Sequence, residues 1–124
     1  MKQHSPQFLK IVEDAKSRVR EIPVPQVLAK IKKAERFHFV DVREDSEWDS
    51  GHAKGAVHIG RGVLERDIEK AIPDPQSPIV LYCGGGFRSA LAADNLQRMG
   101  YKNVRSMAGG WTAWCEAGGT VESS

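Results

Sequence analysis

The chain has 124 residues, of which 40% are hydrophobic and 27% are charged, and its formal net charge is +2. This length suits one domain with one core and is too short for two, and the ordinary composition excludes wholesale disorder. The small net charge gives no ground for nucleic acid or a membrane as a partner. No apolar run approaches the roughly 20 residues of a membrane helix.

Short apolar runs alternate with helical patterns along the chain, which predicts an α/β domain with a parallel sheet. The first helix is predicted to begin at Pro6 behind a Ser5 cap, with an apolar face that includes Ile11. The later elements are predicted, in chain order, as an extended piece at 21–24, a helix around 27–34, strands at 37–42 and 56–59, a helix at 64–72, a strand at 78–82, a helix at 89–99, a strand at 103–107 and a helix at 110–117.

The strand at 78–82 is apolar throughout, as expected of a central strand that is covered on both faces. Residues 1–20 are expected to form a helical extension at the periphery of the sheet. Residues 21–119 are expected to form the domain itself, and residues 120–124 a frayed tail.

The segment that carries the chemistry lies between this buried strand and the next helix, where α/β proteins place their ligands. It consists of Cys83, Gly84, Gly85, Gly86, Phe87, Arg88 and Ser89. Consecutive glycines allow positive φ angles, so successive backbone N–H groups can turn inward as an anion-binding nest. The next helix N-terminus and the Arg88 guanidinium add positive charge. A cysteine in such a cradle is favoured as a thiolate, whereas a plain strand-to-helix turn would need fewer glycines.

The two cysteines are expected to differ, with Cys83 exposed in the glycine loop and Cys115 buried on a helix face with Trp111 and Trp114. We interpret Cys115 as packing, although a role as resolving cysteine stays open. Neither cysteine has the spacing of a metal site, so no metal is expected. Unpaired thiols and the lack of a secretory signal favour a cytoplasmic protein.

The sequence resembles the rhodanese family in four segments, at 41–48, 51–59, 83–89 and 109–111. The resemblance covers about residues 21–117 and implies a three-layer α/β/α domain with a five-stranded parallel sheet, to which this chain adds an N-terminal helix. It also implies ping-pong sulfur transfer, in which a donor such as thiosulfate passes sulfur to the cysteine and a thiophilic acceptor removes it.

On this resemblance the active cysteine is Cys83, and the persulfide is held by the loop of Gly84, Gly85, Gly86, Phe87 and Arg88, with Ser89 capping the following helix. No cofactor is implied beyond the covalent persulfide. The acceptor could be a thiol, cyanide or a protein. Many family members carry a charged or bulky residue where this chain has Gly84, which leaves the donor preference open.

Polar residues outside the loop are further candidates for a role in the chemistry. Asp41 and Arg43 end a strand parallel to the one that ends at Cys83, so we expect them behind the loop as a structural ion pair, although Arg43 could steer an anion. His52 and His58 are interpreted as positioning the backbone, because a thiolate nucleophile needs no general base.

Two other functions stay open from the residues alone. One is a phosphatase or arsenate reductase on the same fold, and the other is a non-enzymatic binding module. The loop has the spacing C-x4-R, whereas the related phosphatases use C-x5-R to surround a tetrahedral oxyanion, so the shorter loop favours sulfur transfer.

Overall fold

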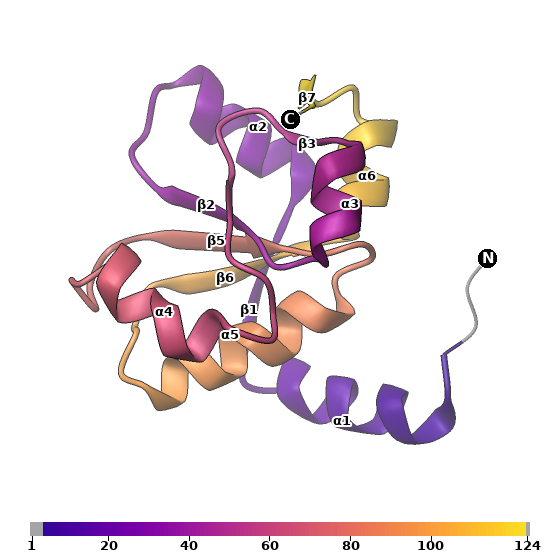
Figure 1. The fold of residues 1–124 in the computed structure, drawn as a ribbon, viewed down its shortest axis with the longest axis vertical. Coiled ribbons are helices and arrows are strands. Elements are labelled where there is room, and N and C mark those ends of the chain that lie inside the picture. The colour runs from indigo at the N-terminus through magenta and orange to yellow at the C-terminus, as the bar shows by residue number, and fades with distance from the viewer. Residues whose placement is uncertain (1–3, 124) are drawn as a thin grey trace.

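The computed structural model describes residues 4–123 (Figure 1). In that part of the chain the elements are α1 (Pro6–Lys16), β1 (Arg20–Pro23), α2 (Val24–Lys32), β2 (His38–Asp41), α3 (Asp45–Ser50), β3 (His52–Ala53), β4 (Val57–His58), α4 (Leu64–Ala71), β5 (Ile79–Tyr82), α5 (Phe87–Arg98), β6 (Val104–Ala108), α6 (Gly110–Glu116) and β7 (Val121–Glu122). All the predicted elements are present, with ends shifted by up to three residues, and the structure adds α3, β3 and β7.

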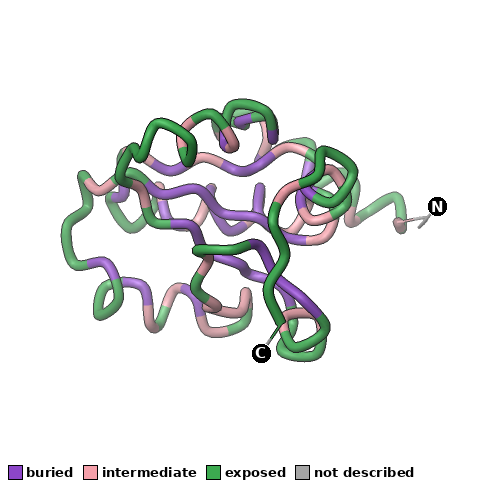
Figure 2. The backbone as a smooth tube through the Cα atoms, turned by 90° about the horizontal axis from the view of Figure 1, so that it is seen from above, coloured by how far each residue is buried: buried purple, intermediate pink, exposed green. Residues whose placement is uncertain are grey.

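Five strands form one parallel sheet in the order β1-β6-β5-β2-β4. Strand β5 lies in the centre of the sheet, between β2 and β6. Its residue Val80 is in register with Phe39 of β2 on one side and with Arg105 of β6 on the other. All four residues of β5 are buried, as the apolar run predicts for a central strand. Figure 2 shows the strands as the buried interior, with exposed residues along the outer helices.

The helices cover both faces of the sheet, because side chains alternate along each strand. Ile79 and Leu81 of β5 pack with α4 and α5, whereas Val80 and Tyr82 pack with α2 and α6 on the opposite face (Figure 1). This three-layer arrangement confirms the predicted fold class.

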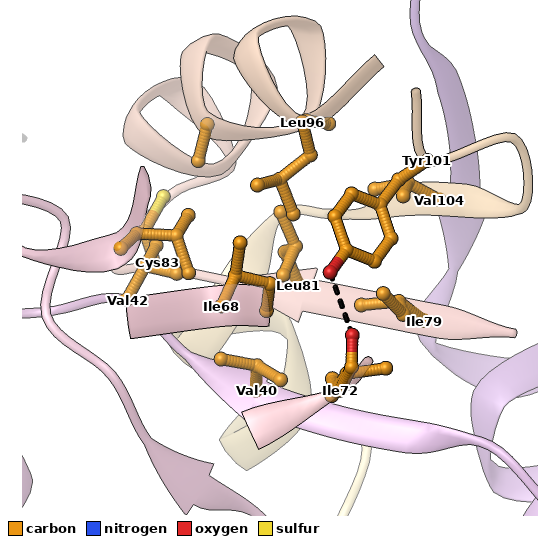
Figure 3. Close-up of a cluster of buried hydrophobic side chains, with 13 residues drawn as sticks. Val40, Val42, Ile68, Ile72, Ile79, Leu81, Cys83, Leu96, Tyr101 and Val104 are labelled. Atoms are coloured by element: carbon orange, nitrogen blue, oxygen red, sulfur yellow. Dashed lines mark hydrogen bonds between the residues drawn. The ribbon is translucent and has the colours of Figure 1, made fainter. Parts of the chain in front are cut away.

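The core on the α4/α5 face lies directly beneath the glycine loop. Figure 3 shows Val42, Leu81 and Cys83 packed together near the start of α5, with Leu96 further along that helix. At the other end of this core, the Tyr101 hydroxyl donates a 2.6 Å hydrogen bond to the carbonyl of Ile72. Burial of the hydroxyl raises the pKa of Tyr101.

The N-terminal helix α1 packs along the outer side of α5 (Figure 1). Val12 and Ala15 are buried in this contact. Just past the helix, the Arg18 guanidinium lies 2.8 Å from the Asp94 carboxylate of α5. The apolar face is narrower than predicted, because Ile11 is 56% exposed.

The start of α1 is as predicted. Pro6 is the first helical residue, and the Ser5 hydroxyl accepts a 3.3 Å hydrogen bond from the backbone N–H of Phe8. This cap fixes where the chain enters the helix. No helix within residues 4–123 combines the length and the hydrophobicity needed to cross a membrane.

The prediction of a frayed tail is wrong at β7, which pairs antiparallel with β3. The chain reverses at Gly118, whose φ of 77° is in the left-handed region. The Thr120 carbonyl then accepts hydrogen bonds from the Lys54 backbone N–H at 2.9 Å and the Trp114 ring N–H at 3.1 Å. These bonds hold residues 120–122 against the domain.

Candidate functional site

Cys83 directly follows the central strand β5, and its side chain is only 1% exposed. The prediction of an exposed thiol is therefore wrong. The alternation of β5 continues for one residue beyond the strand, so Cys83 points to the same face as Ile79 and Leu81 and joins their cluster (Figure 3). The same alternation is visible in the sequence and could have predicted this burial.

Two groups contact the Cys83 sulfur directly. The backbone N–H of Gly86 donates to Sγ at 3.1 Å, and the Ser89 hydroxyl lies 3.4 Å from it. The Ser89 oxygen lies 2.7 Å from the hydroxyl oxygen of Ser106 on β6. A buried row of polar atoms therefore runs from the sulfur into the sheet.

The prediction that Ser89 caps α5 is wrong. The helix begins at Phe87, and Gly86 occupies the cap position with a φ of 96°. Of the three loop glycines only Gly86 has a positive φ. The chain enters the helix at this glycine, so Ser89 falls in the first helical turn, where its side chain is buried beneath Cys83.

One backbone N–H of the glycine loop, that of Gly86, points to the Cys83 sulfur. Apart from Gly86, the N–H groups of the loop have no hydrogen-bond acceptor among residues 4–123, including those of Gly85 and Phe87. Gly85 is exposed, and a side chain there would meet no atom within 4 Å. Gly85 and Phe87 both line the cavity described below, so their backbone N–H groups are available as donors to a ligand there.

The N-terminus of α6 holds the loop from behind. The backbone N–H groups of Trp111 and Thr112 donate to the carbonyls of Cys83 at 2.7 Å and Gly84 at 3.1 Å. A Cβ atom on Gly110 would overlap the Cys83 carbonyl oxygen. The contact explains why glycine is needed at this position.

Arg88, at the end of the loop, is paired with Glu47 of α3. The two guanidinium nitrogens lie 2.8 Å and 3.1 Å from the two carboxylate oxygens. These hydrogen bonds raise the pKa of Arg88, and on the partner side they lower the pKa of Glu47 to about 2 despite its partial burial. Both groups are therefore charged at neutral pH.

Cys83 is one of the residues that line a cavity of about 720 Å³. Loop residues and the ion pair form one side of it, and α6 contributes Trp111. The start of the N-terminal extension also contributes to the lining. The complete lining is His4, Ser5, Phe8, Glu47, Cys83, Gly84, Gly85, Phe87, Arg88, Trp111 and Thr112.

The sequence did not predict Glu47 or the N-terminal residues as part of this site. Glu47 lies within the family segment 41–48, and α3 brings its carboxylate to the Arg88 guanidinium. His4 and Phe8 reach the loop because α1 packs on α5, a contact that no motif in the sequence announces. The feature that could have suggested this contact is the presence of aromatic side chains both at His4 and Phe8 and in the loop at Phe87.

Asp41 and Arg43 form the structural ion pair that the sequence predicts. The Arg43 guanidinium lies 2.8 Å from the Asp41 carboxylate and also donates to the carbonyl of Gly51 at 2.7 Å. Burial opposes the charged form, but the hydrogen bonds and charge of Asp41 outweigh it and hold the pKa of Arg43 above its ordinary value. Arg43 is only 3% exposed and does not line the cavity that contains Cys83. Its charge is therefore not accessible for steering an anion to the loop.

The two histidines of the 51–59 segment also have structural contacts. The His52 ring stacks on Trp48 with ring centroids 3.5 Å apart. A ring nitrogen of His58 lies 2.8 Å from the carbonyl oxygen of Arg43. Neither histidine lines the cavity that contains Cys83.

Cys115 lies on the solvent side of α6 and is exposed, so the prediction of a buried thiol is wrong. Helix α6 buries Gly110 and Trp114, and Cys115 is rotated one residue away from that face. Among residues 4–123, no three His, Cys, Asp or Glu side chains gather in a way that could hold a metal ion.

Comparison with known proteins places this geometry in a family. The rhodanese-like domain family matches residues 24–117. The thiosulfate sulfurtransferase GlpE of Haemophilus influenzae is 40% identical over 78 residues, which are 63% of this chain and 72% of that protein.

Two solved structures are similar over most of the chain. A Rhodopseudomonas palustris protein of unknown function, described as a possible tyrosine phosphatase, is 34% identical with a TM-score of 0.81, and the match covers 98% of this chain and 99% of the other. A rhodanese-like domain from Anabaena is 25% identical with a TM-score of 0.77, and the match covers 84% and 79% of the two chains. This chain belongs to the rhodanese-like domain family.

Proposed function

We propose that this protein is a sulfurtransferase that carries sulfane sulfur as a persulfide on Cys83, with a small anionic donor such as thiosulfate. The observation that carries the proposal is the environment of the Cys83 sulfur. The sulfur accepts the N–H of Gly86, Cys83 lines a cavity, and the loop that follows it has N–H groups without an acceptor among residues 4–123. Curated relatives that are thiosulfate sulfurtransferases support the same enzyme class.

In the first half-reaction the Cys83 thiolate attacks the outer sulfur of thiosulfate. A sulfur–sulfur bond forms between Cys83 and that sulfur, and the bond from the outer sulfur to the sulfonate sulfur breaks. Its electron pair leaves with sulfite. The negative charge then rests on the outer sulfur of the persulfide, where loop N–H groups such as those of Gly85 and Phe87 can stabilise it.

In the second half-reaction a thiolate, cyanide or a protein thiol attacks the outer sulfur of the persulfide. The new bond joins this sulfur to the acceptor, and the electron pair of the broken sulfur–sulfur bond returns to Cys83. No cofactor is required, because the sulfur is carried covalently. The cycle needs a free thiol, which the reducing cytoplasm maintains.

A phosphatase is the second candidate, because one similar structure is described as a possible tyrosine phosphatase. Such an enzyme benefits from an acid that protonates the leaving oxygen. Glu47 is the carboxyl group of the cavity lining, and Arg88 holds its pKa near 2. Glu47 is therefore ionised at neutral pH and cannot donate that proton, which favours sulfur transfer over phosphate hydrolysis.

Intact mass spectrometry tests the proposal. The purified protein is treated with thiosulfate, and we expect a gain of one sulfur atom that dithiothreitol removes. Cys83→Ser should abolish the gain, while Cys115→Ser, which changes the exposed thiol, should retain it. If the protein hydrolyses an aryl phosphate in a Cys83-dependent way and forms no persulfide, it is a phosphatase instead. If it shows neither persulfide formation nor phosphate hydrolysis, it is a binding module.

A further inference from the structure

Part of the lining of the Cys83 cavity comes from the start of the N-terminal extension. The centroids of the Phe8 ring of α1 and the Phe87 ring of the loop are 6.3 Å apart. The centroid of the His4 ring is 5.2 Å from that of Phe8 and 4.8 Å from that of Phe87. We call His4, Phe8 and Phe87 the aromatic wall. All three are half-buried, so part of each ring remains open to contact.

This wall does not suit the sulfur donor. Aromatic faces carry partial negative charge and therefore give a small anion no attraction. Thiosulfate has five non-hydrogen atoms, which would occupy on the order of 150 Å³ if each takes about the volume of one water molecule. The cavity of about 720 Å³ is several times larger, and its size falls in the range of organic ligand sites.

The position of the sulfur limits what can enter. Cys83 is 1% exposed, so a cysteine on a rigid protein surface cannot reach it without a slender group that enters the cavity. A low-molecular-weight thiol meets this condition. Its carbon chain can contact the apolar rings of Phe8 and Phe87, and its charged ends can meet Arg88 and Glu47, which offer both signs of charge.

On these grounds, and resting on the sulfur-transfer function proposed above, we propose that the aromatic wall selects a low-molecular-weight organic thiol as the sulfur acceptor. The thiolate of this acceptor attacks the outer sulfur of the Cys83 persulfide. A new sulfur–sulfur bond gives the acceptor persulfide, and the electron pair of the broken bond returns to Cys83. Phe8 and His4 contact the carbon chain of the acceptor and do not touch the reacting sulfur atoms, so they determine specificity.

The helix that carries Phe8 is firmly placed, so the wall is a built part of the site. Val12 and Ala15 anchor α1 in the core, and the Arg18 guanidinium is bonded to Asp94. Lys16 adds a contact, with its ammonium 4.9 Å from the centroid of the Phe87 ring. Substitution of Phe8 therefore removes one side chain from the wall while these anchors remain.

The test uses glutathione and cyanide as acceptors, with thiosulfate as donor. For Phe8→Ala, we expect kcat/KM with glutathione to fall about tenfold more than kcat/KM with cyanide, because cyanide has no carbon chain to contact the wall. His4→Ala should change the ratio in the same direction and keeps the test valid if Phe8→Ala fails to fold. Leu9→Ala and Ile11→Ala are the matched controls, because both side chains are exposed on the same helix and lie outside the cavity lining.

A binding measurement separates this proposal from the sulfur chemistry. S-methylglutathione cannot accept sulfur, and calorimetric titration should show that it binds the intact protein and binds Phe8→Ala about tenfold more weakly than Leu9→Ala. Binding without any persulfide formation would refute only the sulfur-transfer function. The wall proposal would be overturned if the intact protein did not bind S-methylglutathione. It would also be overturned if Phe8→Ala and His4→Ala left the ratio of kcat/KM with glutathione to kcat/KM with cyanide unchanged. The same conclusion would follow if these variants affected only the turnover with a reduced protein dithiol as acceptor.

Discussion

The hydroxyl oxygens of Ser89 and Ser106 lie 2.7 Å apart, and both side chains are completely buried behind Cys83. The row of Cys83, Ser89 and Ser106 contains two hydrogen bonds. Among residues 4–123, the Ser106 hydroxyl has no other side-chain or backbone partner. The Cys83 thiol donates to the Ser89 oxygen, so the two buried hydroxyl groups hold the sulfur in place from inside the sheet.

Ser89→Ala should slow persulfide formation on Cys83, because the buried hydroxyl that holds the sulfur in place is lost. A hydrogen bond contributes about 0.5–1.5 kcal/mol, and a tenfold change in rate corresponds to about 1.36 kcal/mol. We therefore expect the rate of persulfide formation with thiosulfate to fall by about two- to tenfold. The measurement is the time course of persulfide formation, followed by intact mass spectrometry.

Ser106→Ala should slow the same reaction by a smaller amount, because the Ser89 hydroxyl still contacts the sulfur but loses its own hydrogen-bond partner. Cys115→Ser, which changes the exposed thiol, is the control and should leave the rate unchanged. Identical rates in the two serine variants and the unchanged protein would show that the serines only fill space.

Arg88 and Glu47 should have opposite effects on the donor. Thiosulfate that binds Arg88 must compete with the Glu47 carboxylate, which is already hydrogen-bonded to the Arg88 guanidinium. Arg88→Ala should raise the KM for thiosulfate about tenfold or more, because a charged hydrogen bond is lost. Glu47→Gln should lower this KM, because the competing charge is removed. Steady-state kinetics with cyanide as acceptor measure both effects, and a raised KM in Glu47→Gln would mean that the carboxylate positions Arg88 instead of competing for it.

Gly110→Ala should disturb the loop through the backbone. The new Cβ would overlap the Cys83 carbonyl oxygen and lie 2.9 Å from the Gly84 carbonyl carbon, and backbone atoms cannot move away cheaply. We expect a loss of about 2 kcal/mol or more in the free energy of unfolding, together with slower persulfide formation. Urea unfolding and intact mass spectrometry measure the two effects.

Gly118→Ala is the matched control for this variant. Gly118 also has a positive φ, 77° against 52° at Gly110, but a side chain there meets nothing within 4 Å. It should therefore show only the cost of the left-handed backbone, about 1–2 kcal/mol, with persulfide formation unchanged. Equal effects of the two substitutions on both measurements would exclude the contact between α6 and the loop as the cause.

The fold could be predicted from the sequence because its information is local. The apolar run that ends at Tyr82 and the helical spacing of Leu64 and Ile68 specify a central strand and a covering helix without knowledge of any long-range contact. The motif from Cys83 to Ser89 likewise lies within one segment of seven residues, so the loop could be identified directly.

The other half of the cavity could not be predicted, because it depends on contacts between distant segments. Glu47 reaches Arg88 across 41 residues, and Phe8 reaches Phe87 across the contact of α1 with α5. The exposures of the two cysteines were predicted the wrong way round, because a glycine-rich flank suggested exposure and nearby tryptophans suggested burial. The alternation of a strand and the rotation of a helix decide burial, and composition does not.

The Glu47–Arg88 pair should make stability depend on pH in acid. The ordinary pKa of a glutamate is 4.5, and hydrogen bonds from Arg88 lower that of Glu47 to about 2 in the folded protein. A carboxyl group with a depressed pKa stabilises the folded state above its unfolded pKa, and this contribution is lost as the pH falls from about 4.5 to about 2. Glu47→Gln has no such titration, so its free energy of unfolding should fall less over this range.

The difference between the two proteins, measured by urea unfolding at several pH values, cancels the contributions of all other carboxyl groups. We expect it to be largest near neutral pH, where Glu47→Gln leaves the partly buried Arg88 cation without its counter-charge. It should decrease steadily below pH 4.5 and approach zero only below pH 2, where protonation of Glu47 removes the same charge from the unchanged protein. If the free energies of unfolding of the two proteins change in parallel with pH over this range, Glu47 and Arg88 are not paired in solution. In that case the argument that Glu47 cannot act as a proton donor would no longer hold.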